Sequence, residues 1–385
     1  MDRSTVEKFS RGEAITVEVD RIEKELASLW QAASRGEDGG EHQPIARAAL
    51  WNLVIPARGI DSLSRVKRLV DELVPAVPAR VITLCRGWGH ALAGISATIE
   101  SNVVSRPDGA RQVYAEEITL TGEGAAPDER HFGALVRSLQ IPSLPTATLW
   151  FDASPADSLL SNELLPVSDR LIIDTGRCAG ARELGAVCRM HAVNRVEIGD
   201  LGWLRLAGFR LLFAGLFDPP VGGGPLAAAS HVEIEHRGPK LASALLLAAW
   251  LGVQLGWRPL DATPGVDKGT GIRLRFAAAK GSDGRERTVV VDLRPSQGEC
   301  GTSGIVSLAL NAGGPGETYR VRRTADNHAE LTVPIAPPRT VKLDSRTDAE
   351  LCVGALGPAG RDPLLRRVLP FAERLADLVA ARGAG

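Results

Sequence analysis

Two aspartates follow apolar runs that predict strands, and a carboxylate pair in such a setting can act as a general acid and a general base. Asp152 comes directly after Phe151, and Asp174 comes after the apolar run 171–173. Open α/β sheets often hold ligand groups at the carboxyl ends of their strands. An aspartate at a strand end is also a common turn or helix-cap residue, and this second interpretation predicts no catalytic residue here.

The sequence contains only incomplete motifs for metal binding and for nucleophilic catalysis. Cys178, Cys188 and His191 offer three ligands, whereas a structural zinc site takes four, so the sequence favours core packing and predicts no metal site. Ser303 lies in a Gly-Thr-Ser-Gly stretch that lacks the glycine spacing of a nucleophile elbow, and no nearby histidine or acid is marked as its partner. We therefore predict a turn at Ser303.

Glycine-rich stretches do not complete a nucleotide motif either. Gly122–Pro127 lies between a predicted strand and a predicted helix, but Pro127 occupies the position of the third glycine of a dinucleotide-binding loop. Gly222–Gly224 lacks the Lys-Ser/Thr pair of a P-loop, so it is predicted to be a hinge. No cofactor is predicted.

Composition argues against two classes of partner. The chain has 45 basic and 46 acidic side chains, and its formal net charge of -1 gives no field that would gather nucleic acid or an anionic membrane. The most apolar stretch, Leu241–Trp257, is shorter than the roughly 20 residues of a membrane-spanning helix, so it predicts a buried helix. We expect neither nucleic acid nor membrane as a partner.

The cellular compartment follows from the first residues and from the cysteines. Met1–Arg11 carries charge without a following apolar core, which disfavours a secretory signal. The five cysteines are odd in number and scattered, which argues against a disulfide framework and favours reduced thiols. The chain is therefore predicted to be cytoplasmic.

The first half of the chain predicts a mixed α/β domain. Apolar residues from Ile15 to Ala33 recur at steps of four and three, which predicts a leading amphipathic helix that packs on its own domain or forms a short coiled coil. Further helices are predicted at 61–74, 128–139, 181–191 and 200–217, and strands at 49–55, 80–85, 95–104, 112–121, 146–151 and 170–174. This order predicts a parallel sheet with an antiparallel edge.

A domain boundary is predicted at Pro219–Pro225, where three prolines and three glycines interrupt regular structure. The predicted domains are residues 1–220 and 226–385. The second domain is predicted to be α+β, with one strand and one helix, an antiparallel meander and two terminal helices.

The strand register of the meander can be predicted from its turns. If Asp283-Gly284 forms a two-residue turn, Leu274 lies opposite Leu293, Phe276 lies opposite Val291, and Arg275 lies opposite Asp292. The next pair of strands is predicted to set Val321 opposite Leu331. One face of this sheet is then apolar.

Several blocks of the sequence form a recognisable series along the chain. The most specific block is Asp200–Leu206, with the pattern Asp-Leu-x-Trp-x-Arg-Leu. The other blocks are Ile22–Leu26 with Trp30, Arg47–Leu53, Ala79–Ile82, Ala115–Ile118, Ile141–Pro145 with Leu149–Trp150, Ser168–Asp174, and Phe213–Asp218. In this order the blocks resemble the OpcA family of glucose-6-phosphate dehydrogenase assembly proteins.

This resemblance implies a protein that is not an enzyme. It implies that the chain binds glucose-6-phosphate dehydrogenase and favours its active oligomer, and so regulates the oxidative pentose phosphate pathway. An activator of this kind must bind the active assembly more tightly than the inactive one. The alternative is an enzyme or sensor that binds a sugar phosphate at Asp174 and nearby loops.

Six residues are candidates for partner binding. Arginines are well suited to interfaces because the planar guanidinium makes several directed hydrogen bonds. The solvent face of the predicted meander carries Arg273, Arg275, Arg320 and Arg322, which a solvated one-sided sheet also explains. Trp203 and Arg205 are predicted either to lie inside their domain, with Arg205 in an internal ion pair, or to contact a partner directly.

Overall fold

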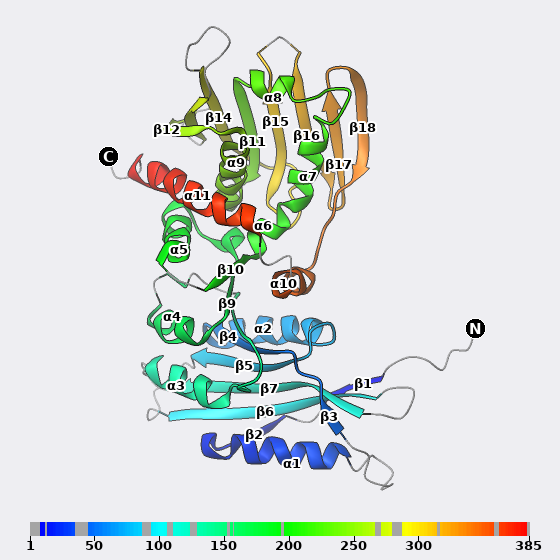
Figure 1. Ribbon diagram of the computed structural model, residues 1–385, viewed down its shortest axis with the longest axis vertical. Coiled ribbons are helices and arrows are strands. Elements are labelled where there is room, and N and C mark those ends of the chain that lie inside the picture. Colours follow the sequence, from blue (N-terminus) through cyan, green and yellow to red (C-terminus); the bar gives the residue numbers. More distant parts are fainter. Residues whose placement is uncertain are drawn as a thin grey trace, which may run out of the picture. The chain divides into compact units, whose positions relative to one another are not determined.

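A computed structural model of the chain divides into two compact units, each formed from several stretches of sequence. The structure describes residues 8–11, 14–34, 45–86, 94–105, 111–123, 129–151, 155–156, 158–193, 196–265, 271–278, 287–313, 316–357 and 362–382. Unit 1 comprises Met1–Ile173, Val196–Gly199 and Asp348–Gly357, and unit 2 comprises Asp174–Arg195, Asp200–Thr347 and Pro358–Gly385. Figure 1 shows their elements.

Unit 1 is built on a mixed sheet with the strand order β1-β6-β7-β5-β4-β8-β9-β10, where β2 also pairs with β6 and β3 with β7. The strands are β1 Lys8–Arg11, β2 Ile15–Val17, β3 Ile45–Arg47, β4 Trp51–Ala57, β5 Ala79–Arg86, β6 Gly94–Ser105, β7 Arg111–Glu123, β8 Thr146–Trp150, β9 Arg170–Ile173 and β10 Glu197–Asp200. The β7-β5-β4-β8-β9 pairs are parallel, and β1 and β2 pair antiparallel with β6, which itself pairs antiparallel with β7. The predicted mixed α/β class is confirmed.

The helices of unit 1 are α1 Ile22–Ser34, α2 Gly59–Leu73, α3 Glu129–Leu139, α4 Leu159–Leu164 and α10 Asp348–Leu356, with short 3-10 turns η1 Val19–Arg21 and η2 Leu165–Val167. The predicted leading helix begins seven residues too early. Ile15–Val17 instead forms β2, because its β-branched residues pair with β6 in the register Ile15 to Ile99. Helix α1 buries Ile22 and Leu26 in the core.

Unit 2 is built on an eight-stranded sheet with the order β12-β13-β14-β11-β15-β16-β17-β18. The strands are β11 His231–Arg237, β12 Arg258–Pro264, β13 Ile272–Ala278, β14 Arg287–Ser296, β15 Ile305–Asn311, β16 Thr318–Ala325, β17 His328–Val333 and β18 Ala336–Lys342. Strand β11 lies between β14 and β15 and pairs in parallel with β14. The predicted meander is therefore split into two antiparallel runs, although the α+β character of this part holds.

The predicted register of β13 and β14 is wrong by two residues. Leu274 lies opposite Val291, Phe276 opposite Val289, and Arg273, rather than Arg275, lies opposite Asp292. The predicted turn at Asp283-Gly284 lies outside the described residues. A shift of two keeps every side chain on its predicted face, because the side-chain period of a strand is two. The prediction that Val321 faces Leu331 is confirmed.

The helices of unit 2 are α5 Ala181–Val193, α6 Leu201–Arg205, α7 Ala207–Gly215, α8 Gly224–Ala228, α9 Leu241–Leu255 and α11 Pro363–Arg382, with 3-10 turns η3 Thr175–Arg177 and η4 Gly238–Lys240. The single helix predicted at 200–217 is two helices that meet at Leu206. The prediction of a buried helix at 241–257 is confirmed, because every side chain of α9 from Ala242 to Gly252 is buried.

By length and composition, Gly238–Leu255 is the one candidate membrane span among the described residues, and 61% of that window is buried inside the protein. A helix with core contacts on all sides is apolar all round for that reason. The apolar composition of α9 is therefore explained by its packing in unit 2.

The two compact units do not follow the predicted boundary at 219–225. Residues 174–195 and 200–220 belong to unit 2, and α10 belongs to unit 1 although it lies in the predicted second domain. Just before the Pro-Gly stretch, Phe217 packs against Tyr319, with ring centroids 5.1 Å apart. Local composition marks a break in regular structure, but it carries no information on such long-range contacts.

Candidate functional site

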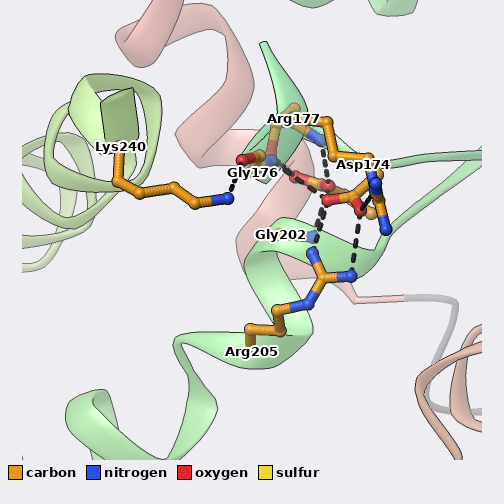
Figure 2. A network of polar contacts seen from close by, with 8 residues as sticks. Asp174, Gly176, Arg177, Gly202, Arg205 and Lys240 are labelled. Carbon is orange, nitrogen blue, oxygen red and sulfur yellow. Dashed lines mark hydrogen bonds and ion pairs between the residues drawn. The ribbon is translucent and has the colours of Figure 1, made fainter. Parts of the chain in front are cut away.

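The predicted strand-end aspartate Asp174 lies at the centre of a buried network in unit 2. Its carboxylate accepts two hydrogen bonds from Arg205, with Nη1 2.5 Å from Oδ1 and Nη2 2.9 Å from Oδ2. Arg177 Nε donates to Oδ2 at 2.9 Å, and the backbone N–H of Gly176 donates to Oδ1 at 3.1 Å. Figure 2 shows Asp174 between the two arginines. Both of its oxygens are therefore engaged.

A second carboxylate, Asp200, orders the same turn from the other side. It accepts hydrogen bonds from the backbone N–H of Thr175 at 3.0 Å, from the hydroxyl of Thr175 at 2.6 Å and from the backbone N–H of Gly202 at 2.9 Å. Asp200 is 1% exposed. Burial raises its pKa from 3.8 to about 6, against the opposing effect of these donors.

Gly202 and Lys240 complete the network. A Cβ on Gly202 would lie 2.4 Å from the Thr175 hydroxyl and 2.6 Å from the Gly176 nitrogen, so only glycine permits this close approach. Lys240 Nζ donates to the carbonyl of Gly176 at 2.8 Å (Figure 2). Burial lowers the pKa of Lys240, and the negative charge of Asp174 opposes that shift. Two carboxylates, Asp174 and Asp200, and three cations, Arg177, Arg205 and Lys240, thus hold one short turn.

This arrangement is that of a cap and ion-pair network. Asp174 is the N-cap of η3, as the turn-or-cap interpretation predicts, and Asp200 is the N-cap of α6. Asp152, the other half of the catalytic pair, lies outside the described residues. A carboxylate whose oxygens already accept charged hydrogen bonds is poorly placed to take a proton from a substrate.

We expect replacement of Asp200 by asparagine to change the pH dependence of stability. Because the pKa of Asp200 is raised in the folded state, the folded protein holds this proton more tightly than the unfolded chain does, so stability falls as pH rises from about 4 to about 6. The raised pKa corresponds to ~3 kcal/mol lost across that window. The asparagine oxygen still accepts from Thr175 and Gly202, whereas the charge is gone.

The measurement is the free energy of unfolding of the wild type and of Asp200→Asn at pH values across this window. The variant should lose less stability than the wild type as pH rises. Equal pH dependence in the two proteins would contradict the raised pKa of Asp200.

Trp203 and Arg205 both lie inside unit 2. Trp203 is 1% exposed, and its Nε1 donates to Asp362 at 2.6 Å. The guanidinium of Arg210 stacks on the Trp203 ring, 3.3 Å from its centroid. Burial lowers the pKa of Arg210 to about 10. Sequence reasoning missed Arg210 as a partner of Trp203, although its spacing of seven residues, two helical turns, was the available signal.

The four candidate arginines of the sheet form two separate pairs. Arg273 donates to both oxygens of Asp292, at 2.8 and 2.7 Å, and Arg275 donates to Asp261. The expected pairing of Asp292 with Arg275 is therefore wrong, and its cause is the register shift of two described above. Both arginines have acidic partners within unit 2.

Arg320 and Arg322 lie on β16, on the same face as Arg273. Arg273 on β13 and Arg320 on β16 occupy the same row of the sheet, with β14, β11 and β15 between them. The two arginines are therefore four strand spacings apart, or about 19 Å. Arg322 lies opposite Glu330. The structure therefore brings the arginines to one face but not into one cluster.

Acidic side chains on β11 were missed as part of this face. Glu233 accepts from Arg294 at 3.2 Å, and Glu235 accepts from Ser307 at 2.9 Å. Their alternation with Val232 and Ile234 was the signal in the sequence. The outer face of the sheet thus carries charges of both signs.

No group of three metal-ligating side chains occurs among the residues that the structure describes. Cys178 and Cys188 are buried, and burial raises the pKa of both thiols, while the side chain of His191 is outside the described part. Ser303 accepts from the backbone N–H of Ile305 at 3.3 Å and donates to the carbonyl of Cys300 at 3.1 Å, so the predicted turn residue is confirmed. Of the predicted glycine loop, residues 124–127 are not described.

Two family models match the chain in consecutive stretches. Both describe a glucose-6-phosphate dehydrogenase subunit: residues 70–188 match its N-terminal domain, and residues 196–369 match its C-terminal domain. The junction of the two matches, between 188 and 196, precedes the boundary predicted at 219–225.

Two curated relatives are described as OxPP cycle protein OpcA. The relative from Synechocystis sp. is 28% identical over 66% of this chain and 58% of its own length. The relative from Nostoc punctiforme is 28% identical over 61% of this chain and 47% of its own length. The match thus spans about half the length of these relatives.

Solved structures with a similar course of the chain include oxidoreductases. An oxidoreductase from Sinorhizobium meliloti has a TM-score of 0.48 and 11% identity, covering 87% of this chain and 98% of that one. A biliverdin reductase from Synechocystis sp. has a TM-score of 0.45 and 9% identity, covering 86% of this chain and 98% of that one. Both TM-scores are below 0.5, so neither fold nor function rests on these likenesses.

Proposed function

Because this chain belongs to the OpcA family of glucose-6-phosphate dehydrogenase assembly proteins, we propose that it binds glucose-6-phosphate dehydrogenase and promotes the active oligomer of that enzyme. The observation that carries this proposal is the match to both domain models in order, over residues 70–188 and 196–369. In this role the chain regulates the oxidative pentose phosphate pathway and acts in the cytoplasm, where it has neither a nucleic acid nor a membrane as partner.

We also propose that the chain has no catalytic activity and no cofactor of its own. In support, Asp174 and Asp200 are saturated by donors from their own unit, and Asp174 serves as a cap. An activator of this kind works by binding the active assembly more tightly than the inactive one. No specific observation favours the sugar-phosphate enzyme or sensor as a second candidate.

The test combines a pull-down with an activity measurement. We expect the chain to recover glucose-6-phosphate dehydrogenase from native lysate of its own organism, to raise the specific activity of the purified enzyme, and to shift it to a larger oligomer in light scattering. The chain alone should not turn over glucose 6-phosphate. Failure to bind the enzyme, or turnover by the chain alone, would reject the proposal.

For the partner surface we propose the outer face of the unit 2 sheet, which carries Arg273, Arg275, Arg320 and Arg322. Arg273 and Arg275 already pair with Asp292 and Asp261, so Arg320 and Arg322 are the better residues to test. The Nε of Arg320 is buried and lacks a hydrogen-bond partner in the described part of the chain. Trp203 and Arg205 would support this surface from the interior, since both are buried.

We expect the double variant Arg320→Gln/Arg322→Gln to associate more slowly with the dehydrogenase, with the largest effect at low salt, because removing charges from an interface weakens electrostatic steering. The matched control is Arg287→Gln/Arg339→Gln, which removes two charges at positions that pair with Ala278 and Leu331, on the other face. Association rates of the wild type and the two double variants, measured across a salt series, test this expectation. Equal rates for both double variants would move the interface away from this face.

A further inference from the structure

Unit 1 contains a cavity of about 170 Å³ whose lining residues take no part in the network of unit 2 or in the proposed partner surface. Helix α2 forms one wall with Leu63, Lys67 and Val70, and strands β5, β6 and β7 form the floor. The polar content of that floor is unusual, because the face of a sheet that packs under a helix is ordinarily apolar.

Threonine hydroxyls line the floor in a row. Thr98 on β6 lies opposite Thr119 on β7, and Thr119 lies beside Thr83 on β5, so three hydroxyl-bearing side chains follow one another across three adjacent strands. Thr121 lies two residues farther along β7, on the same face. A hydroxyl both donates and accepts hydrogen bonds, so this row suits ligand groups that also do both.

Two carboxylates border the threonine row. Glu100 and Glu117 are directly opposite each other on β6 and β7, an arrangement that like charges make unfavourable. Lys67 Nζ lies 3.6 Å from a Glu100 oxygen, and Asn102 donates to Glu117 at 2.6 Å. The lining therefore carries one positive and two negative side chains.

Asn102 fixes the position of one lining carboxylate although it does not line the cavity itself. It is 3% exposed, and its amide nitrogen donates to Glu117 at 2.6 Å. Glu117 is therefore oriented from behind by a buried side chain.

We propose that this cavity binds a small neutral polyhydroxylated ligand, of the class of unphosphorylated monosaccharides and polyols. Hydroxyls of such a ligand donate to Glu100 and Glu117 and accept from Lys67, while the threonine row does both. The excess negative charge of the lining opposes a phosphate group. At ~30 Å³ for each water-sized group, the cavity holds roughly six such groups, the size of one sugar ring with its hydroxyls. The proposal does not depend on the proposed function.

Calorimetric titration of the full chain with glucose, glucosamine and glucose 6-phosphate tests the class, because the three sugars share a ring and differ in charge. Glucose should bind saturably, and glucose 6-phosphate should bind at least tenfold more weakly. No saturable binding of glucose overturns the proposal, as does tighter binding of glucose 6-phosphate. Glucosamine binding more than tenfold tighter than glucose also overturns it, because the site would then recognise an ammonium group.

Two variants test the location of the site. Thr119→Val keeps the shape of the side chain and removes the central hydroxyl, and should weaken glucose binding by about tenfold. The Lys67 side chain is half exposed on α2. Lys67→Met therefore removes the donor on the helix wall of the cavity and changes no residue of the sheet. Thr332→Val, on the outer face of the unit 2 sheet, is the control and should bind as the wild type does. Unchanged binding in both cavity variants overturns the proposal.

Discussion

Arg205→Ala is expected to destabilise unit 2 by roughly 3–5 kcal/mol, the range observed when one partner of a buried ion pair is removed. The Asp174 side chain is 1% exposed and the Arg205 side chain is 6% exposed, so neither charge is screened by solvent. Without Arg205, Asp174 keeps the Gly176 N–H and Arg177, whose side chain is 34% exposed, but loses the one arginine that is buried with it.

Amide hydrogen exchange measures this effect where it arises. Protection of the Thr175, Gly176 and Gly202 amides should drop in Arg205→Ala, because all three belong to the network. Arg205→Lys keeps the charge but loses the two-pronged contact, so its effect should be intermediate. Arg189→Ala is the control in the same unit, since that arginine is 49% exposed and its loss should cost no more than about 1 kcal/mol. An equally small cost for Arg205→Ala would show that the ion pair contributes little.

The family blocks contain residues that hold the fold together. In Asp200–Leu206, the aspartate caps a helix, Gly202 permits a close backbone approach and Trp203 donates to Asp362. In Ser168–Asp174, Arg170 donates to the last two carbonyls of α10, those of Ala355 and Leu356, and to the carbonyl of Gly357 just after it, at 2.6 to 3.0 Å. These residues of the family blocks therefore serve the stability of the fold.

Local pattern was sufficient for most elements of the fold. Helix α2 was predicted because Val66, Leu69, Val70 and Leu73 recur at helical spacing, and all four are buried. The faces of β13 and β14 were predicted by their alternation. The register was not, because it depends on the connection between Ala278 and Arg287, which lies outside the described residues.

Contacts between distant residues could not be read from local pattern. Arg205 and Asp174 are 31 residues apart, and Arg170 meets the end of α10 across 185 residues. Position 205 was expected to form an internal ion pair or to contact a partner, and the structure supplies Asp174 as the internal partner. The hydroxyl row of the cavity depends on strand pairing, because threonine in a strand is ordinary and becomes informative only when its neighbours across the sheet are known.

Arg80 and Glu116 form a second buried pair, in unit 1, and lie in the blocks Ala79–Ile82 and Ala115–Ile118. Arg80 Nε donates to Glu116 at 2.7 Å, and the two side chains are 2% and 1% exposed. The same guanidinium donates to the carbonyl of Leu139 at the end of α3 and to Glu23 on α1 at 2.5 Å. One side chain thus joins two strands and two helices.

Arg80→Met is expected to destabilise unit 1 by roughly 3–5 kcal/mol, because it removes the buried cation that pairs with Glu116 in the core. The double variant Arg80→Met/Glu116→Leu removes both charges and should recover much of that loss, as well-packed apolar replacements of buried ion pairs often do. Glu23→Gln removes the exposed partner of the same guanidinium, and since that carboxylate is 57% exposed the cost should stay within about 1 kcal/mol. Free energies of unfolding for the wild type and these three variants, followed by amide exchange in β5 and β7, measure the difference between losing the buried partner and losing the exposed one.

Two outcomes would contradict the prediction. If Glu23→Gln costs as much as Arg80→Met, or if the double variant is no more stable than Arg80→Met alone, the stability of unit 1 does not depend on the charge balance between Arg80 and Glu116.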